Sequence, residues 1–451
     1  MRLGLFVALL MTAIAAVAGS AQGVHAAAGG FKTPAVGAHP KYVYIGSASP
    51  LPSLTVFGCQ TRTIANPLEA CYGPDQIQRA YGFKPLLDQG LTGAGRTIVI
   101  VDAFQSPTLQ QDLALFDTAF NLPAPNLQII APDGLTPFNP ADANQVGWSA
   151  EISLDVQWSH AVAPGANLVV VLAKSDDDAD ILSATKYALD HKLGDVLSQS
   201  FGEAEQCVLP AIAAEEHQVF DAMVAQNWTL FASSGDDGAA QPTCDGSEVF
   251  KAASSPASDP DVTGVGGTQL NATPVVLNAT HTAIVDPGGQ YVGETTWNEF
   301  DEYGAAGGSG LSVLFKRPDF QAPVTDSKSR VVPDVSYNAA INGGVIAFWG
   351  VPFGVGAAFR FGGTSAGSPQ WSGLAAITDQ LAGSRVGNIN KTLYKLGKKN
   401  QSQYFHDVTT GDNSFPPVVG FSAGPGFDDA TGWGSPIASA LVPAIAKPGN
   451  G

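Results

Sequence analysis

The chain is short of positive charge, and its charged residues of both signs are few. Its 451 residues include 22 Lys and Arg against 40 Asp and Glu, which gives a formal charge of −18. A surface of this sign repels nucleic acid and anionic membranes, so we expect neither as a partner. Because carboxylates lose their mutual repulsion as pH falls toward about 4, the composition also suits an acidic medium.

Long apolar runs are also missing after the N-terminal segment. No stretch beyond residue 26 is long enough, and free enough of Gly and Pro, to span a bilayer. Residues 1–26 are typical of a signal peptide, with Arg2, an apolar run over 3–18 and a cleavage site at Val24-His25-Ala26. We therefore expect a secreted, extracellular protein without membrane contact after signal removal. An uncleaved N-terminal anchor is the alternative.

Cysteine is scarce, and no two cysteines have the C-x-x-C spacing of a zinc site. In an exported protein, four cysteines are typical of two disulfides. Proximity in the sequence favours Cys59–Cys71 and Cys207–Cys244, although four cysteines allow three pairings.

From Cys71 onward, strand signals alternate with helix signals. A helix is expected over 76–89, and a buried strand over 96–102 opens an alternation that continues to a strand over 229–233. This pattern predicts a mostly parallel, doubly wound sheet with helices on both faces. After Thr268 the chain reads as loop-rich until the region of residue 365, and it ends in a Gly-rich tail.

The expected organisation has three parts. A signal peptide over 1–26 is followed by a short, loosely ordered N-terminal arm or leader over 27–70 and by one large domain over 71–446. No repeat or coiled coil is present, so we expect a monomer.

One glycine-rich stretch, Gly362–Pro369, follows apolar and small residues over 345–361 and precedes an expected helix over 371–381. Glycines let the backbone pass close to another group, and the free N–H groups of a helix N-terminus favour negative charge. Ser365 therefore stands where an acyl-transfer nucleophile is typically presented. An ordinary N-cap serine is the alternative.

Two acids, Glu151 and Asp155, are four residues apart on an expected helix over 148–161. This spacing puts both carboxyl groups on one face, which apolar neighbours such as Trp158 keep from full hydration. Because two close carboxyl groups cannot both ionise easily, one has a raised pKa and can act as a general base in acid. On a solvated surface the same pair needs no function.

Asp236 follows the strand over 229–233, and ligands bind at the carboxyl ends of strands in an open parallel sheet. A protonated Asp there can donate a hydrogen bond to a developing oxyanion, although a turn residue would look the same. A histidine base is not evident, because no histidine lies in a Gly-rich turn. The seven histidines are His25, His39, His160, His191, His217, His281 and His406.

Further short motifs occur in a fixed order between residues 71 and 440. They are Tyr72-Gly-Pro-Asp-Gln-Ile77, Val162-Ala-Pro-Gly-Ala166, Ser198-Gln-Ser-Phe-Gly202, Ser234-Gly-Asp-Asp-Gly238, Ser254-Ser-Pro256, Val265-Gly-Gly-Thr268, Gly308-Ser-Gly-Leu-Ser312, Val332-Pro-Asp-Val335 and Thr431-Gly-Trp-Gly-Ser-Pro436. With Gly362–Pro369 and the acid pair, this set resembles the sedolisins, serine-carboxyl peptidases with a subtilisin-like fold. The resemblance implies an α/β, subtilisin-like peptidase domain over 71–446 with a C-terminal calcium-binding loop region.

The resemblance also implies a role for each catalytic residue. Ser365 would be the nucleophile, Glu151 its general base, and Asp155 the residue that orients Glu151 and shares protons with it. Asp236 would form the oxyanion site with the Ser365 N–H. Glu151 takes the place of the subtilisin histidine, which explains the missing base and implies an acidic optimum.

A substrate groove and one structural Ca²⁺ ion are implied as well. The groove residues are Ser198, Ser200, Phe201, Gly202, Ser233, Ser234 and Gly235. The Ca²⁺ ligands are the side chains of Asp407 and Asp428 and the carbonyls of Val408, Gly424 and Gly426. Without the resemblance, these ligands read as a Gly-rich turn with solvated acids.

The expected function is that of a secreted, acid-acting serine endopeptidase that cleaves proteins or peptides through an acyl-enzyme. Two alternatives stay open: a non-catalytic peptide-binding relative on the same scaffold, and an acid esterase. Sedolisins are usually made with a long propeptide, whereas only residues 27–70 separate the signal from the catalytic domain here. The sequence therefore predicts either no such device or a much shorter arm.

Overall fold

A mostly parallel sheet of eight strands organises the part of the chain that the structure describes. The computed structural model describes residues 36–37, 40–47 and 55–447. In spatial order the strands are β15 (Tyr291–Thr296), β12 (Thr263–Ala272), β8 (Thr229–Ser233), β6 (Val196–Gln199), β3 (Thr97–Ala103), β5 (Asn167–Ala173) and β4 (Asn126–Ile130), with β18 (Val335–Asn338) paired to β12. Only β15 is antiparallel to its neighbour.

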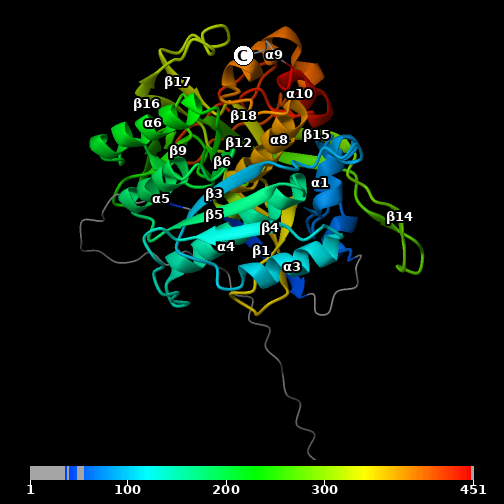
Figure 1. Ribbon diagram of the computed structural model, residues 1–451. Coiled ribbons are helices and arrows are strands. Elements are labelled where there is room, and N and C mark those ends of the chain that lie inside the picture. The colour runs from blue at the N-terminus through cyan, green and yellow to red at the C-terminus, as the bar shows by residue number, and fades with distance from the viewer. Residues whose placement is uncertain (1–35, 38–39, 48–54, 448–451) are drawn as a thin grey trace, which may run out of the picture. The chain divides into compact units, whose positions relative to one another are not determined.

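Both faces of this sheet are covered by helices (Figure 1). On β3, Ile98 and Ile100 pack into one core while Val99 and Val101 pack into the other, as the two-residue period of a strand requires. The first core is completed by α1 (Pro74–Ala80), α3 (Leu109–Phe120), α4 (Ala143–Val162), α8 (Gly367–Ala382), α9 (Asn390–Tyr404) and α10 (Ala438–Ile445). The second core is completed by α5 (Asp178–Asp190) and α6 (Pro210–Ala225). The predicted doubly wound α/β fold is confirmed.

Three details differ from the sequence-based expectations. The helix expected over 76–89 is split into α1 and α2 (Lys84–Leu87), because Gly82 between them has a φ of +74°. The region after Thr268 is rich in strands rather than loops. The Gly-rich tail contains α9 and α10. Gly397 lies inside α9 and Pro443 inside α10, and both residue types weaken the helical signal in the sequence.

The remaining elements are short and connect the main sheet and helices. They are β7 (Glu203–Ala204), β9 (Ala240–Pro242), β10 (Val249–Lys251), β11 (Ser254–Ser255), β13 (Val276–Leu277), β14 (Ile284–Asp286), α7 (Phe300–Tyr303), β16 (Gly310–Lys316), β17 (Ser329–Val332), β21 (Phe405–His406), β22 (Ser435–Pro436) and the 3₁₀ turns η1 (Gly58–Thr61) and η2 (Thr364–Ala366). Among the helices of the described ranges, none combines the length and apolar character needed to cross a membrane.

Part of the expected N-terminal arm belongs to a second sheet. Its strand order is β1 (Lys41–Ser47), β20 (Ala357–Gly362), β19 (Gly344–Phe348) and β2 (Cys71–Tyr72). β1 runs antiparallel to β20, and its first pair joins Lys41 to Gly362. The expectation of a loosely ordered arm over 27–70 is therefore wrong for residues 41–47. The partner strand lies some 300 residues away in the sequence, so no local pattern indicates this pairing. The predicted signal peptide lies outside the described residues.

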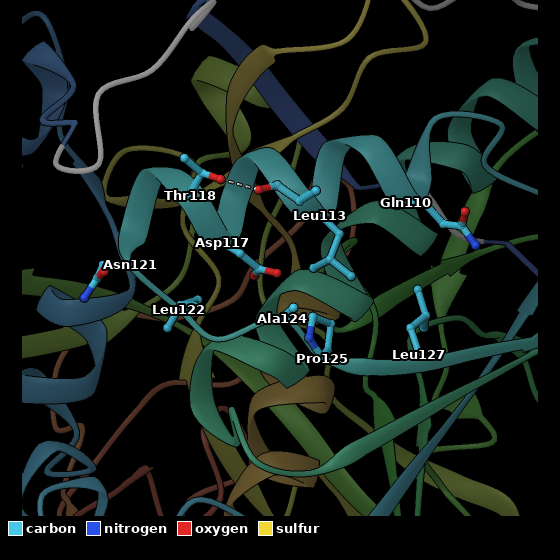
Figure 2. Close-up of a pocket in the computed structure, with 10 residues that line it drawn as sticks. Gln110, Leu113, Asp117, Thr118, Asn121, Leu122, Ala124, Pro125 and Leu127 are labelled. Atoms are coloured by element: carbon cyan, nitrogen blue, oxygen red, sulfur yellow. Dashed lines mark hydrogen bonds between the residues drawn. The ribbon is translucent and has the colours of Figure 1, made fainter.

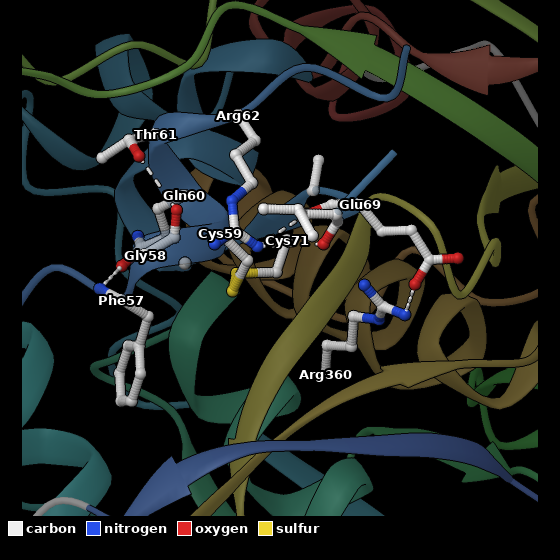
Figure 3. Close-up of a disulfide and its surroundings, with 12 residues drawn as sticks. Phe57, Gly58, Cys59, Gln60, Thr61, Arg62, Glu69, Cys71 and Arg360 are labelled. Atoms are coloured by element: carbon white, nitrogen blue, oxygen red, sulfur yellow. Dashed lines mark hydrogen bonds and ion pairs between the residues drawn. A yellow bond between two sulfur atoms is a disulfide. The ribbon is translucent and has the colours of Figure 1, made fainter. Parts of the chain in front are cut away.

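Two disulfides confirm the pairings that sequence proximity favours. Cys59–Cys71 ties η1 to β2 (Figure 3). In the same view, Glu69 forms an ion pair with Arg360 of β20, which fastens this segment to the second sheet. Cys207–Cys244 joins the loop after β7 to the loop between β9 and β10.

Candidate active site

The sharp turn between β20 and α8 holds Ser365. Gly363, in this turn, has a φ of +119°, and a Cβ atom built there would lie 2.7 Å from Asp236 Oδ2. Only glycine suits both conditions. Ser365 follows in η2, is 5% exposed, and donates its hydroxyl hydrogen to the Ser200 carbonyl at 3.4 Å. The turn therefore brings the predicted nucleophile against the end of β6.

Helix α4 supplies two fully buried acids, Glu151 and Asp155. Asp142 caps this helix by accepting a hydrogen bond from a backbone N–H of the first turn. α4 packs closely on α8, since a Cβ atom on Gly373 would lie 2.7 Å from Val162 Cγ1. This close approach keeps the acid pair beside the serine turn.

A third buried acid, Asp102, joins the pair from the carboxyl end of β3. Within the described residues, neither of its carboxyl oxygens has a hydrogen-bond partner. Sequence reasoning missed this residue, although an Asp at the end of a buried parallel strand was a signal that could have found it. The three carboxyl groups come from α4 and β3, so only the tertiary structure brings them together.

Burial is the main cause that raises the pKa of all three acids. For Glu151 the charges of Asp155 and Asp102 raise the pKa further, while the Ser365 hydroxyl lowers it. The pKa of Asp155 is raised by burial and lowered by interactions with Ser200 and Glu151. Burial, followed by the charge of Asp155, raises the pKa of Asp102. Such a group of neighbours shares protons rather than ionising fully.

Asp236 lies on the loop after β8, next to the serine turn. Its carboxyl group accepts the Thr364 N–H at 2.8 Å and the Thr364 hydroxyl at 2.9 Å. Burial raises the pKa of Asp236, while the Thr364 bonds and the charge of Lys41 lower it. The structure therefore brings Ser365, Glu151, Asp155 and Asp236 to one place at the carboxyl edge of the main sheet.

The expected groove residues fall into two groups. Ser200 contacts Ser365 twice: its carbonyl accepts the Ser365 hydroxyl, and its own hydroxyl donates to the Ser365 carbonyl at 3.3 Å. The Gly202 backbone pairs with Gly37, and the Gly235 N–H donates to the Thr364 hydroxyl at 3.1 Å. The other side chains point into the protein: Ser198 bonds Ser368, Phe201 packs against Trp148, Ser234 bonds the Gly308 carbonyl, and Ser233 is only 4% exposed. A groove between these segments would therefore be lined mainly by backbone atoms. Ser198 is buried beneath these segments, where it bonds Ser368.

The expected calcium ligands lie on two neighbouring loops. Asp407 accepts the Gly426 N–H at 3.1 Å, and Asp428 accepts the Gly424 N–H at 3.0 Å. Val408 is fully buried next to Asp407. The donor set consists only of carboxylate and carbonyl oxygens, which is the chemistry that Ca²⁺ prefers. The residues therefore fit such an ion.

Two other features do not belong to this site. The atoms of His217, Asp221 and Asp261 lie within 4.8 Å of one another, but the His217 Nδ1 bonds Asp259 at 2.8 Å, and this ion pair accounts for the histidine. A cavity of about 590 Å³ lies between α3 and the segment leading to β4. Figure 2 shows the residues that line it, and none of the expected catalytic residues is among them.

The described histidines have partners other than Ser365. His160 bonds the Pro123 carbonyl at 2.7 Å, and His406 stacks on Tyr291. Among the described residues, no histidine forms a hydrogen bond with Ser365. A serine hydroxyl whose neighbours are buried carboxyl groups, on a doubly wound sheet, is the arrangement typical of serine-carboxyl peptidases.

Comparisons with known proteins agree with this class. Kumamolisin of Bacillus sp. (strain MN-32) is 31% identical over 420 residues, which cover 86% of this chain and 70% of kumamolisin. Sedolisin of Pseudomonas sp. (strain 101) is 31% identical over 358 residues, 76% of this chain and 57% of that protein. Xanthomonalisin of Xanthomonas sp. (strain T-22) is 28% identical over 406 residues, 85% of this chain and 47% of that protein. The chain thus spans between about half and 70% of these relatives. No protein-family model matches it.

The fold comparison gives the same result. The structure of Pseudomonas sedolisin, a serine-carboxyl proteinase complexed with two molecules of pseudo-iodotyrostatin, matches with a TM-score of 0.68 and 27% identity. The match covers 84% of this chain and 98% of that one. The chain belongs to the sedolisin family of serine-carboxyl peptidases, as its motifs predicted.

Proposed function

We propose that this protein is a secreted endopeptidase that cleaves proteins or peptides in acid, with Ser365 as nucleophile and Glu151 as general base. The observation that carries the proposal is the meeting of Ser365 with the buried Glu151–Asp155 pair, where no histidine of the described residues bonds Ser365. A module that only bound peptides would not need a nucleophile beside carboxyl groups whose pKa values are raised. The peptide-binding alternative is therefore less well supported.

The chemistry follows from the positions of these groups. Glu151 takes the proton of the Ser365 hydroxyl as the oxygen attacks the carbonyl carbon of the substrate. Asp236, when protonated, and the Ser365 N–H donate hydrogen bonds to the oxyanion. Glu151 then gives its proton to the leaving amine as the C–N bond breaks. In the second half of the reaction Glu151 takes a proton from water as the water oxygen attacks the acyl carbon, and returns that proton to the Ser365 oxygen as the ester bond breaks. Asp155 and Asp102 share protons with Glu151 throughout.

We expect activity to be confined to acid because Asp236 must keep its proton to act as a donor. Asp236→Asn supplies a donor that does not titrate, so its alkaline limb should move to higher pH, with a loss of about 10- to 100-fold at the optimum. The measurement is kcat/KM on acid-denatured haemoglobin between pH 2 and 8. An alkaline limb that stays in place in the variant would contradict the assignment of Asp236. A simple ester serves as the second substrate: cleavage of the ester alone would favour the esterase alternative.

We also propose one structural Ca²⁺ ion, held by Asp407, Asp428 and the carbonyls of Val408, Gly424 and Gly426. Ca²⁺ would tie the two loops together and stabilise the native state by mass action. Chelation should lower the unfolding midpoint by several degrees at pH 6, and added Ca²⁺ should restore it. Asp428→Asn should abolish this response, whereas Asp301→Asn on exposed α7 should not. An unfolding midpoint that changes with neither chelator nor added Ca²⁺ would contradict the proposed calcium site.

A further inference from the structure

A cavity lies beside α3, next to the edge of the main sheet. Its volume is about 590 Å³, and it is bounded by α3 and by the segment that leads into β4, the strand at one end of the sheet order. Pockets of about 300 to 1,000 Å³ are typical of small-molecule sites. None of the residues that line this cavity acts in the proposed function, so peptide cleavage gives no reason for it.

The walls of this cavity, which we call the α3 cavity, are mainly apolar. Figure 2 shows its lining side chains, among which are Leu113, Leu122, Pro125 and Leu127. The neutral polar residues of the lining are all exposed to solvent, and they are Gln110, Thr118 and Asn121. Asp117 is the one lining residue that can carry a charge. An apolar pocket with a single buried acid selects a ligand with an apolar body and one polar end.

The Asp117 carboxyl group is buried and incompletely paired. Figure 2 shows its side chain pointing from α3 toward the opposite wall of the cavity, at Ala124 and Pro125. The side chain is only 9% exposed, and its Oδ1 has no hydrogen-bond partner among the described residues. A buried carboxylate oxygen without a partner is unfavourable, so a donor or a cation that reaches it is bound favourably.

The neighbouring histidine, His160 of α4, does not supply this partner. Its Nε2 lies 3.3 Å from Asp117 Oδ1 but 2.7 Å from the Pro123 carbonyl, which can only accept, so the Nε2–H donates to Pro123. The His160 Nδ1 is buried without a partner, and a protonated ring would leave a hydrogen there without an acceptor. Burial raises the pKa of Asp117, whereas His160 lowers it in part. Asp117 therefore lacks a full counter-charge among the described residues.

We propose that the α3 cavity binds a small aliphatic amine, with its ammonium group on the Asp117 carboxylate and its hydrocarbon stem against Leu113, Leu122 and Pro125. The ammonium group supplies the donors and the positive charge that Asp117 lacks, and it favours the charged form of the acid. The stem gains the burial of its methylene groups on the apolar walls. The formal charge of −18 also attracts cations to the protein and repels carboxylates.

Calorimetric titration of the full chain at pH 7 with three probes of one chain length, 1-aminohexane, hexan-1-ol and hexanoate, tests the proposal. The amine should bind at least about tenfold more tightly than the alcohol, because only the amine pairs with a charge, and hexanoate should bind more weakly than either. Asp117→Asn should weaken binding of the amine at least about tenfold and that of the alcohol by less than about twofold. Asp190→Asn, which neutralises an exposed acid at the end of α5, should leave all three unchanged.

A second variant decides the outcome if circular dichroism shows that Asp117→Asn does not fold. Ala114 is exposed on α3 and lines the cavity, so Ala114→Trp places a large side chain in the space of the ligand. This change should weaken binding of amine and alcohol alike at least about tenfold. The proposal would be overturned by equal binding of amine and alcohol, by amine binding that either folded variant leaves unchanged, or by no amine binding at all. Because no lining residue takes part in catalysis, a lack of peptidase activity would contradict the proposed function alone.

Discussion

Replacing Ser365 by alanine should reduce the cleavage of acid-denatured haemoglobin by about 10⁴- to 10⁶-fold, because the variant has no oxygen with which to form the acyl-enzyme. The residual rate would come from binding and from the oxyanion donors alone. The measurement is kcat at pH 4 with saturating substrate. An active-site label that reacts with serine should modify the unchanged chain and not the variant.

A matched serine change separates this loss from a general effect on folding. Ser368, the second residue of α8, is fully buried and bonds Ser198 at 3.0 Å. Ser368→Ala removes one hydrogen bond of about 1 kcal/mol and no reacting atom, so most activity should remain. If both alanine variants lost activity equally while staying folded, the nucleophile would have to be sought elsewhere.

Replacing Glu151 by glutamine should lower kcat by about 10²- to 10⁴-fold, because an amide of the same shape cannot take the proton of the Ser365 hydroxyl. The measurement is the pH profile of kcat/KM between pH 2 and 7, and the loss should persist at every pH. Glu299→Gln is the matched control, since Glu299 is also a buried acid with a raised pKa but bonds Trp297 and backbone N–H groups away from Ser365. Activity that survives Glu151→Gln would point to another base.

The same variant should change how stability depends on pH. The folded-state pKa of Glu151 is raised above its unfolded value, so the stability it contributes is present below the unfolded pKa and lost as pH rises through the folded one. Glutamine does not titrate, so the unfolding midpoint of Glu151→Gln should fall less than that of the unchanged chain between pH 4 and 7. A midpoint lower than that of the unchanged chain at pH 7 would show that the activity loss reflects damage to the fold.

Much of the site could be predicted from the sequence because its signals are local. Glu151 and Asp155 are one helical turn apart, so their shared face follows from the helix repeat alone. Ser365 stands in a turn whose glycines and following helix are adjacent in the chain, and the cysteines that pair are neighbours in the sequence. Each of these features is set by residues fewer than 40 positions apart.

Other features were decided only by the tertiary structure, because they depend on contacts between distant parts of the chain. Asp102 joins the acid pair because β3 and α4 pack together, and Gly37 meets Gly202 across 165 positions of sequence. Ser198, expected to line the groove, turns instead toward Ser368 on α8. Local periodicity carries no record of such pairings, since the free energy that selects them comes from burial and backbone hydrogen bonds formed after the elements meet.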